Sequence, residues 1–181
     1  MEAGQTKLLH VLEKSGAKLY TLLVKLTLRE EVAEDLMQDL FVKLSSSNGF
    51  ERSENASGYA WRSAINLAFD WRRRQKRVHD GLEGKLLAEQ NEPSPLARMV
   101  QAEEMQQVLE ATGRLSELMR EVFVMRYFQQ DSYEEIAERF GKQPQQVRAM
   151  CSKAMKELRE FLTDKDRQKV EKEAEKYHEL G

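Results

Sequence analysis

The chain has 181 residues, a formal net charge of −2, 33% charged residues, 9 Gly and 3 Pro, which is typical of a helix-rich protein of one or two domains. No apolar run reaches the ~18 residues that a membrane span requires, and the N-terminus lacks the basic and apolar blocks of a secretory signal. One cysteine excludes an internal disulfide and a Cys-rich metal site. We therefore expect a cytoplasmic protein without membrane insertion.

Helical periodicity predicts an all-α fold of two small domains, and no segment alternates as a strand does. Between residues 78 and 97 the period fails and two Gly and two Pro occur, which indicates a flexible linker. The predicted organisation is a first domain over 5–77, the linker over 78–97, a second domain over 98–162 and a charged extension over 163–181. The extension is expected to continue the last helix in solvent, and a partner-binding role stays open. The predicted helices span 5–27, 30–46, 56–77, 98–112, 116–129, 132–140 and 144–162.

The helix predicted over 30–46 is apolar on one broad face and acidic on the other. Leucines recur at helical spacing, and Met37 and Phe41 flank them, so we expect these side chains to be buried. Asp35, Gln38 and Asp39 belong to a polar patch beyond the first turn, where the helix dipole no longer explains acidic residues. This patch suits a basic protein surface, although an ordinary solvated face would look the same.

The helix predicted over 56–77 is basic and aromatic. From Arg62 to Arg77 six basic residues accompany one acidic residue, a local balance of +5. At ~100° per residue, one face is packed, with both tryptophans as core residues. The opposite face carries the basic stripe, Arg62, Asn66, Arg73 and Arg77. Arg and Asn can contact base edges and Arg neutralises phosphate, so this stripe indicates nucleic-acid binding rather than a solvated helix end.

Two features beside the stripe are also candidate functional sites. Ile65 and Phe69 are predicted to be exposed at its border, where they could contact an unstacked base. The preceding loop, 45–58, is polar and is expected to be flexible. Such loops carry function when rigid helices hold them, or serve as simple connectors.

Residues 132–161 predict two helices joined by a tight turn. Ser132 and Glu135 form a capping box, Gly141 ends the first helix, and Pro144 suits the first position of the second. The second helix is apolar on one face, where Cys151 is expected to be a core residue, and basic on the other. This is the geometry by which a helix-turn-helix presents a recognition helix to the DNA major groove.

In this order the segments resemble a sigma factor of bacterial RNA polymerase, of the small extracytoplasmic-function group, over about residues 8–162. Residues 33–44, AEDLMQDLFVKL, are similar to the segment with which the family binds the polymerase clamp. Residues 59–77, YAWRSAINLAFDWRRRQKR, resemble the helix that recognises and melts the −10 element. Residues 114–162 resemble the domain that binds the −35 element and the polymerase flap.

The resemblance assigns residues to three contacts. It implies core polymerase binding by Asp35, Gln38 and Asp39. On the −10 side it implies DNA contacts by Arg62, Asn66, Arg73, Arg74 and Arg77. On the −35 side it implies DNA contacts by Gln145, Gln146, Arg148, Ser152, Lys153 and Lys156. The chain departs from the family pattern at Lys142, Gln143, Met150 and Ile65, which bears on promoter preference. The resemblance also implies control by an anti-sigma factor or by an extension.

The leading interpretation is a transcription initiation factor that binds core RNA polymerase, directs it to promoters and assists DNA melting. The alternative is a free-standing helix-turn-helix regulator, which would need neither the acidic helix nor the basic stripe. An enzyme is not expected. The three histidines lie in unrelated contexts, and no metal-ligand spacing, nucleophile–base pair or phosphate-binding glycine loop occurs. No catalytic residue, metal site or cofactor is therefore predicted.

Overall fold

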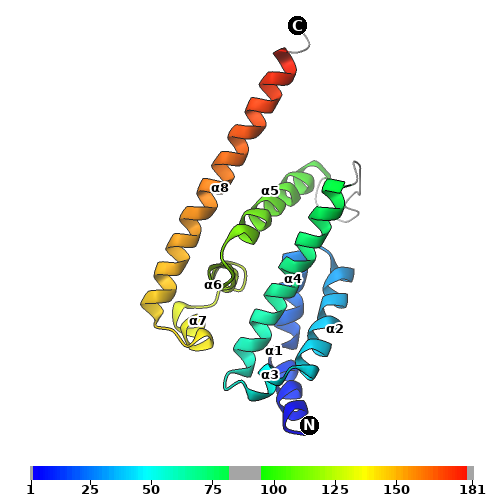
Figure 1. Cartoon of the computed structure of the whole chain (residues 1–181), viewed down its shortest axis with the longest axis vertical. Coiled ribbons are helices and arrows are strands. Elements are labelled where there is room, and N and C mark those ends of the chain that lie inside the picture. Colours follow the sequence, from blue (N-terminus) through cyan, green and yellow to red (C-terminus); the bar gives the residue numbers. More distant parts are fainter. Residues whose placement is uncertain (1, 82–94, 179–181) are drawn as a thin grey trace.

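The computed structural model describes residues 2–81 and 95–178, and these residues confirm the predicted all-α fold (Figure 1). The central part of the predicted linker and the last residues of the predicted extension lie outside the described residues. In the described ranges the helices are α1 (Glu2–Thr27), α2 (Glu30–Ser46), α3 (Asn48–Arg52), α4 (Ala56–Gly81), α5 (Pro95–Arg114), α6 (Glu117–Tyr127), α7 (Tyr133–Phe140) and α8 (Pro144–His178).

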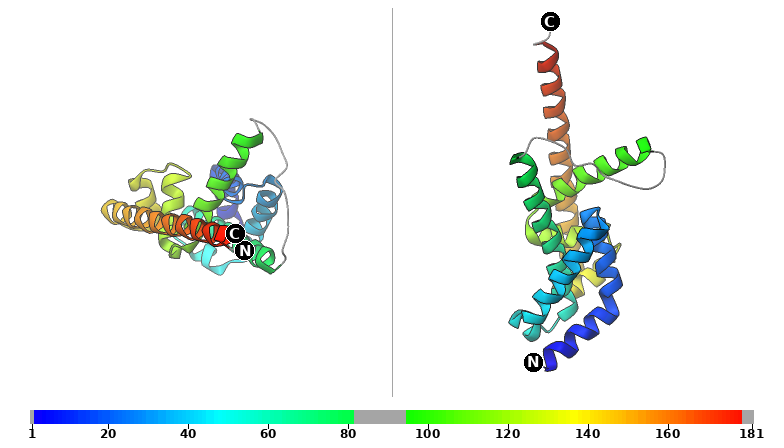
Figure 2. Two further views of the ribbon diagram at one scale, coloured as in Figure 1. Left: turned by 90° about the horizontal axis from the view of Figure 1, so that it is seen from above. Right: turned by 90° about the vertical axis from the view of Figure 1, so that its right-hand side faces the viewer.

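The helix boundaries follow the predicted ones closely, except that three helices are clearly longer. Helix α2 has the predicted bounds, whereas α4 and α5 each continue for several residues into the predicted linker. Helix α8 runs without a break to His178, so the predicted extension is helical as far as that residue, and it projects beyond the other helices (Figure 2). None of the described helices combines the length and apolar character needed to cross a membrane.

Helices α1, α2 and α4 pack around a common core of leucine, alanine and aromatic side chains. Ala64 and Ala68 of α4 are fully buried there, and both tryptophans belong to this core as predicted. Two burial predictions are wrong. Phe41 is 47% exposed, because the apolar face of α2 is broader than the surface that α1 and α4 cover. Ile65 and Phe69 are buried, because α6 covers the side of α4 that the first domain leaves open.

The loop predicted over 45–58 contains the short helix α3 and is anchored at several points. The Ser47 hydroxyl accepts a hydrogen bond from the Phe50 N–H at 3.1 Å and lies 2.9 Å from the Tyr59 hydroxyl. Phe50 is 1% exposed and packs edge-on against Tyr59. Lys7 of α1 donates hydrogen bonds to the carbonyls of Glu51 and Ser53. The prediction of a flexible loop is therefore wrong for this segment, since its one large apolar residue reaches the core.

The helix-turn-helix is formed by α7 and α8, as predicted. Ser132 and Glu135 make both hydrogen bonds of the capping box, and Gly141 adopts the left-handed conformation at φ 60°. Side chains of α8 at positions 147, 151, 154 and 158 are buried against α5, α6 and α7. Burial raises the pKa of the Cys151 thiol, which agrees with its predicted role as a core residue.

Replacement of Ser132 by alanine should destabilise the C-terminal domain, because the cap is formed by this side chain. Loss of such a cap costs about 1 kcal/mol, which thermal unfolding should register as a lower Tm. The hydrogen bonds from Ser132 also lower the pKa of Glu135. The difference between wild type and variant should therefore persist at neutral pH and shrink as the pH falls through the lowered pKa of Glu135. Ser45→Ala is the control, because Ser45 is exposed and caps no helix. An equal decrease in Tm for the two variants would contradict the assignment of Ser132 as a cap.

Candidate nucleic-acid and polymerase interfaces

The outer face of α2 presents the predicted acidic patch together with apolar groups. Asp35, Gln38 and Asp39 are all exposed, as required of a docking surface. Phe41 and Val42 are 47% and 62% exposed on the same helix. Gln38, Phe41 and Val42 also line a shallow groove between α1 and α2. Exposed apolar side chains within a polar rim are typical of protein interfaces. This surface therefore resembles a protein interface more closely than its acidic residues alone would indicate.

The basic stripe of α4 is divided into two parts by the fold. Arg74 and Arg77 lie near the C-terminal end of α4 and are exposed, while Arg73 is exposed and forms an ion pair with Asp70 one turn away. Arg62 and Asn66, nearer the start of α4, are half-buried beneath the second domain. The predicted −10 residues thus share one helix, but only part of the stripe is open to solvent.

Asn66 is held by three side chains of α6. Its amide nitrogen donates to Glu117 Oε1 at 2.6 Å and to Glu121 Oε1 at 3.0 Å. Its carbonyl oxygen accepts from Arg120 Nη2 at 3.0 Å. Arg62 Nε lies 3.7 Å from Glu121 Oε2. This arrangement fills the hydrogen-bonding capacity that Asn66 would use to read a base edge.

The burial of the α6 side chains affects their pKa values. Glu121 is 3% exposed, and this burial raises its pKa, which the hydrogen bond from Asn66 and the charge of Arg62 partly counteract. Arg120 is 6% exposed and stacks on Phe69, and burial lowers its pKa. Both groups are removed from water chiefly because α4 and α6 meet here.

The outer face of α8 carries the predicted −35 residues. The neighbouring apolar positions of α8 point into the domain, whereas all six predicted residues are exposed. These six are Gln145, Gln146, Arg148, Ser152, Lys153 and Lys156. The residue before α8 is Gln143 rather than a residue with a capping hydroxyl, and its backbone N–H donates to the Gln146 side chain at 3.0 Å. Met150 is half-buried against the core.

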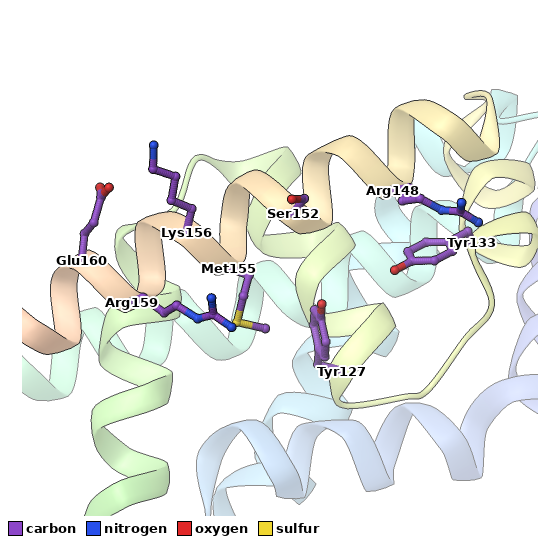
Figure 3. A pocket seen from close by; sticks show the side chains of 8 residues that line it. All are labelled: Tyr127, Tyr133, Arg148, Ser152, Met155, Lys156, Arg159 and Glu160. Carbon is purple, nitrogen blue, oxygen red and sulfur yellow. The ribbon is translucent and has the colours of Figure 1, made fainter.

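A groove on this face gathers further residues that sequence reasoning did not identify. Arg148, Ser152 and Lys156 line it together with Tyr127, Tyr133 and Arg159 (Figure 3). The guanidinium groups of Arg148 and Arg126 lie 5.1 and 4.6 Å from the centre of the Tyr133 ring. The Arg148 guanidinium therefore lies against the Tyr133 ring. Arg159 could have been found from its helical spacing to Ser152 and Lys156, but Tyr133 comes from another helix and left no signal in the pattern.

Comparison with known proteins agrees with this arrangement. Residues 11–78 match the family described as sigma-70 region 2, and residues 105–158 match the family described as sigma-70, region 4. The chain is 30% identical over 139 residues to the RNA polymerase sigma factor YlaC of Bacillus subtilis (strain 168), covering 74% of this chain and 79% of that protein. The chain belongs to the sigma-70 family. It is a member of the extracytoplasmic-function group, as the resemblance predicted.

A solved structure is also similar to this sigma factor. The sigma factor RpoE from Bartonella quintana, in complex with the anti-sigma factor NepR, aligns with a TM-score of 0.46 and 23% identity, covering 90% of this chain and 98% of that one.

The family assignment decides between the two predicted functions. The region 2 match covers α2 and most of α4, the parts that a free-standing helix-turn-helix regulator would not need. The sigma factor is thus a transcription initiation factor, and the alternative of a free-standing regulator is wrong.

Proposed function

We propose that this sigma factor docks on core RNA polymerase through α2, contacts the −10 element with α4 and contacts the −35 element with α8. The two domains would be residues 5–77 and 98–162, joined by a linker over 78–97. The first would meet the polymerase clamp and the second the flap. The protein would act in the cytoplasm, where polymerase and promoters are, and would perform no catalysis of its own.

The observation that carries this proposal is the composition of the exposed face of α2. Asp35, Gln38 and Asp39 are polar and exposed beside two large apolar side chains that the fold leaves uncovered. An exposed phenylalanine costs solvation free energy unless a partner buries it, and aromatic groups supply much of the free energy of protein interfaces. The acidic rim would match a basic partner surface and increase the association rate.

Promoter contacts are supported by where the cationic groups lie. On α4 the exposed Arg73, Arg74 and Arg77 would meet phosphate, while Asn66 and Arg62 have the donors and acceptors for base edges. The contact of the buried Phe50 with the half-buried Tyr59 gives α3 a rigid base beside the start of α4. That rigidity would let the neighbouring backbone support a base that leaves the stack.

The proposal is tested by reconstitution with core polymerase. The full chain should co-purify with core enzyme. The reconstituted holoenzyme should select a promoter from a random DNA library and transcribe from it. Core enzyme alone serves as the control. Failure of the full chain to bind core enzyme at physiological salt would contradict the proposal.

The groove on α8 gives a prediction that separates base reading from phosphate binding. Arg148→Ala should relax specificity at one or two positions of the −35 element, since a bidentate base contact supplies about 1–3 kcal/mol of discrimination. Tyr133→Ala should have a similar but smaller effect, because Arg148 loses its support, whereas Tyr133→Phe should retain specificity. Lys156→Ala should weaken binding to all sequences alike and lower the salt slope by about one unit.

These effects can be measured by holoenzyme binding to a library of −35 variants at several salt concentrations. Lys14→Ala is a control that removes a positive charge from the exposed surface of α1, far along the chain from the helix-turn-helix. Uniform weakening by Arg148→Ala, with an unchanged order of preferred sequences, would show that Arg148 contacts phosphate only.

A further inference from the structure

The short helix α3 is held at its last turn by a side chain that is distant in the sequence. It lies at the same end of the first domain as the first turns of α1 and the start of α4 (Figure 1). The Lys7 ammonium group donates hydrogen bonds to the backbone carbonyls of Glu51 at 2.7 Å and Ser53 at 2.9 Å. These carbonyls belong to the last turn and the C-cap of α3, where a helix leaves its own acceptors without intrahelical partners.

Helix α3 is too short to fix its own geometry. It has five residues, and helices shorter than about 12 residues are marginal unless tertiary contacts support them. A cation beside the last carbonyls accepts their hydrogen-bonding capacity and complements the negative end of the helix dipole. Lys7 supplies both effects from α1, so the conformation of α3 depends on a residue more than forty positions earlier in the chain.

The other anchors of α3 lie at its start and on its inner face. The Ser47 hydroxyl caps the first turn of α3 and lies 2.9 Å from the hydroxyl of Tyr59 on α4. Phe50 is buried in the core of the domain. The N-terminal end of α3 is thus joined to α4, and its C-terminal end is joined to α1 through Lys7.

The position of Lys7 is itself fixed by its neighbours on α1. Leu8 and Val11 are 3% and 5% exposed and pack into the core, so the first turns of α1 cannot rotate without withdrawing buried side chains. Lys7 is half-buried. Two hydrogen bonds to backbone carbonyls offset the entropy lost when a long side chain is ordered. Lys7 is therefore a fixed support and not a mobile surface charge.

The carbonyls that Lys7 holds come directly before α4. Asn55 follows Ser53 by two positions, and its side-chain oxygen accepts the Gly58 N–H at 2.7 Å, which caps the first turn of α4. So short a connection leaves little slack. A displacement of Ser53 would therefore be passed to the cap of α4 and to the backbone beside it.

The outer side of residues 47–55, which we call the receiving segment, is open to solvent. Asn48, Gly49 and Arg52 are exposed there. Their side chains and backbone offer hydrogen-bonding groups of the kind that hold a base outside the stack. Lys7 lies behind this surface, on the side where the segment meets α1.

We propose that Lys7 is a positioning residue for promoter opening: its two hydrogen bonds hold the receiving segment in the place where it accepts a base that leaves the stack. The proposal rests on the proposed −10 role of α4 and of the segment before it. Lys7 acts through the backbone of α3 and makes no contact with DNA. Because a binding constellation must be held within about 0.5 Å of its productive geometry, loss of Lys7 should affect the captured base and not the whole promoter.

Four variants separate positioning from charge. Lys7→Met removes the charge and both hydrogen bonds but keeps a long unbranched side chain, whereas Lys7→Arg retains the charge and the donors. Lys14→Met is the matched control, because it makes the same change at an exposed position about two turns further along α1. Ser47→Ala loosens the opposite end of α3 and leaves α1 unchanged.

Each full-length variant is reconstituted with core polymerase and mixed with fork-junction promoter DNA. The unpaired −10 strand carries 2-aminopurine at one position at a time, and this probe becomes more fluorescent when it leaves the stack. For Lys7→Met we expect the increase to be lost at one or two positions, with about a tenfold loss of base discrimination there, since a hydrogen bond to a charged group supplies a factor of about ten. Ser47→Ala should affect the same positions, and Lys7→Arg and Lys14→Met should resemble the wild type.

The alternative roles of Lys7 give different results. An unchanged fluorescence pattern in Lys7→Met would show that Lys7 only stabilises the domain, whatever the change in Tm, and would overturn the proposal. A uniform decrease at all positions, with a flatter salt dependence, would show that Lys7 meets phosphate directly and would also overturn it. Effects of Lys7→Met and Ser47→Ala at different positions would exclude a shared action through α3.

Hydrogen exchange of the free variants tests the cause independently of polymerase. The Ser53 N–H donates to the Phe50 carbonyl at 3.2 Å. Lys7→Met should speed the exchange of this amide and leave the amides of α2 unchanged. Wild-type protection of the Ser53 amide would overturn the proposal.

Failure of this proposal differs from failure of the proposed function. If α4 is not the −10 element, substitution of Arg62, Asn66 and Arg73 leaves promoter opening intact. If α4 is the −10 element but Lys7 does not position the receiving segment, those substitutions impair opening while Lys7→Met retains the fluorescence pattern of the wild type.

Discussion

Replacement of Asp35, Asp39 and Phe41 by alanine should weaken binding to core RNA polymerase by about 100-fold. A desolvated aromatic residue at the centre of an interface contributes at least about 2 kcal/mol, and loss of rim charges adds to this mainly through slower association. Together these correspond to roughly 2.7 kcal/mol, or two factors of ten. The measurement is a titration of labelled core enzyme at physiological salt.

The triple variant should remain folded, since Asp35 and Asp39 are exposed on α2 and Phe41 is 47% exposed. Its Tm should fall only modestly, through the part of Phe41 that the fold covers. Glu31→Ala with Lys43→Ala is the matched control, because both residues are exposed on the same helix but lie outside the proposed surface. Equal affinity of the triple variant and this control would exclude the face of α2 as the docking site.

The second large effect is expected for promoter melting. Holoenzyme containing Arg62→Ala, Asn66→Ala and Arg73→Ala should bind core polymerase normally but open promoter DNA at least about 100-fold less, because it loses a base-reading amide and two cations. A good base contact supplies about 1–3 kcal/mol and a charge-assisted hydrogen bond about 1.5–3 kcal/mol. Permanganate reactivity of unpaired thymines measures the opened fraction directly.

Single substitutions should divide this effect into two kinds. Asn66→Ala should reduce discrimination between −10 sequences, whereas Arg73→Ala should weaken all of them and flatten the salt dependence. The control is Lys14→Ala with Lys18→Ala, which removes two exposed charges of α1. Normal melting by the triple variant would mean that α4 is not the melting element. The holoenzyme is used because Arg62 and Asn66 also contact α6 in the free chain.

Local sequence was enough to predict most of the helices. The capping box of Ser132 and Glu135, the left-handed Gly141 and the first-turn Pro144 act within one or two turns, so their effects can be read without knowing the rest of the fold. The buried face of α8 followed from its period, and its exposed face from the remaining positions. The acidic patch on α2 and the basic stripe on α4 were likewise visible as patterns of composition.

Contacts between distant segments decided the features that the patterns missed. Phe41 is exposed and Phe69 is buried, although each lies on an amphipathic helix, because burial depends on which neighbouring helix covers which side. Phe50 draws a polar segment into the core through a contact with Tyr59. Asn66 is the clearest case. Its partners on α6 lie 51–55 positions further along the chain. Helical periodicity places Asn66 on the polar face of α4. Only the packing of the second domain determines which residues that face contacts.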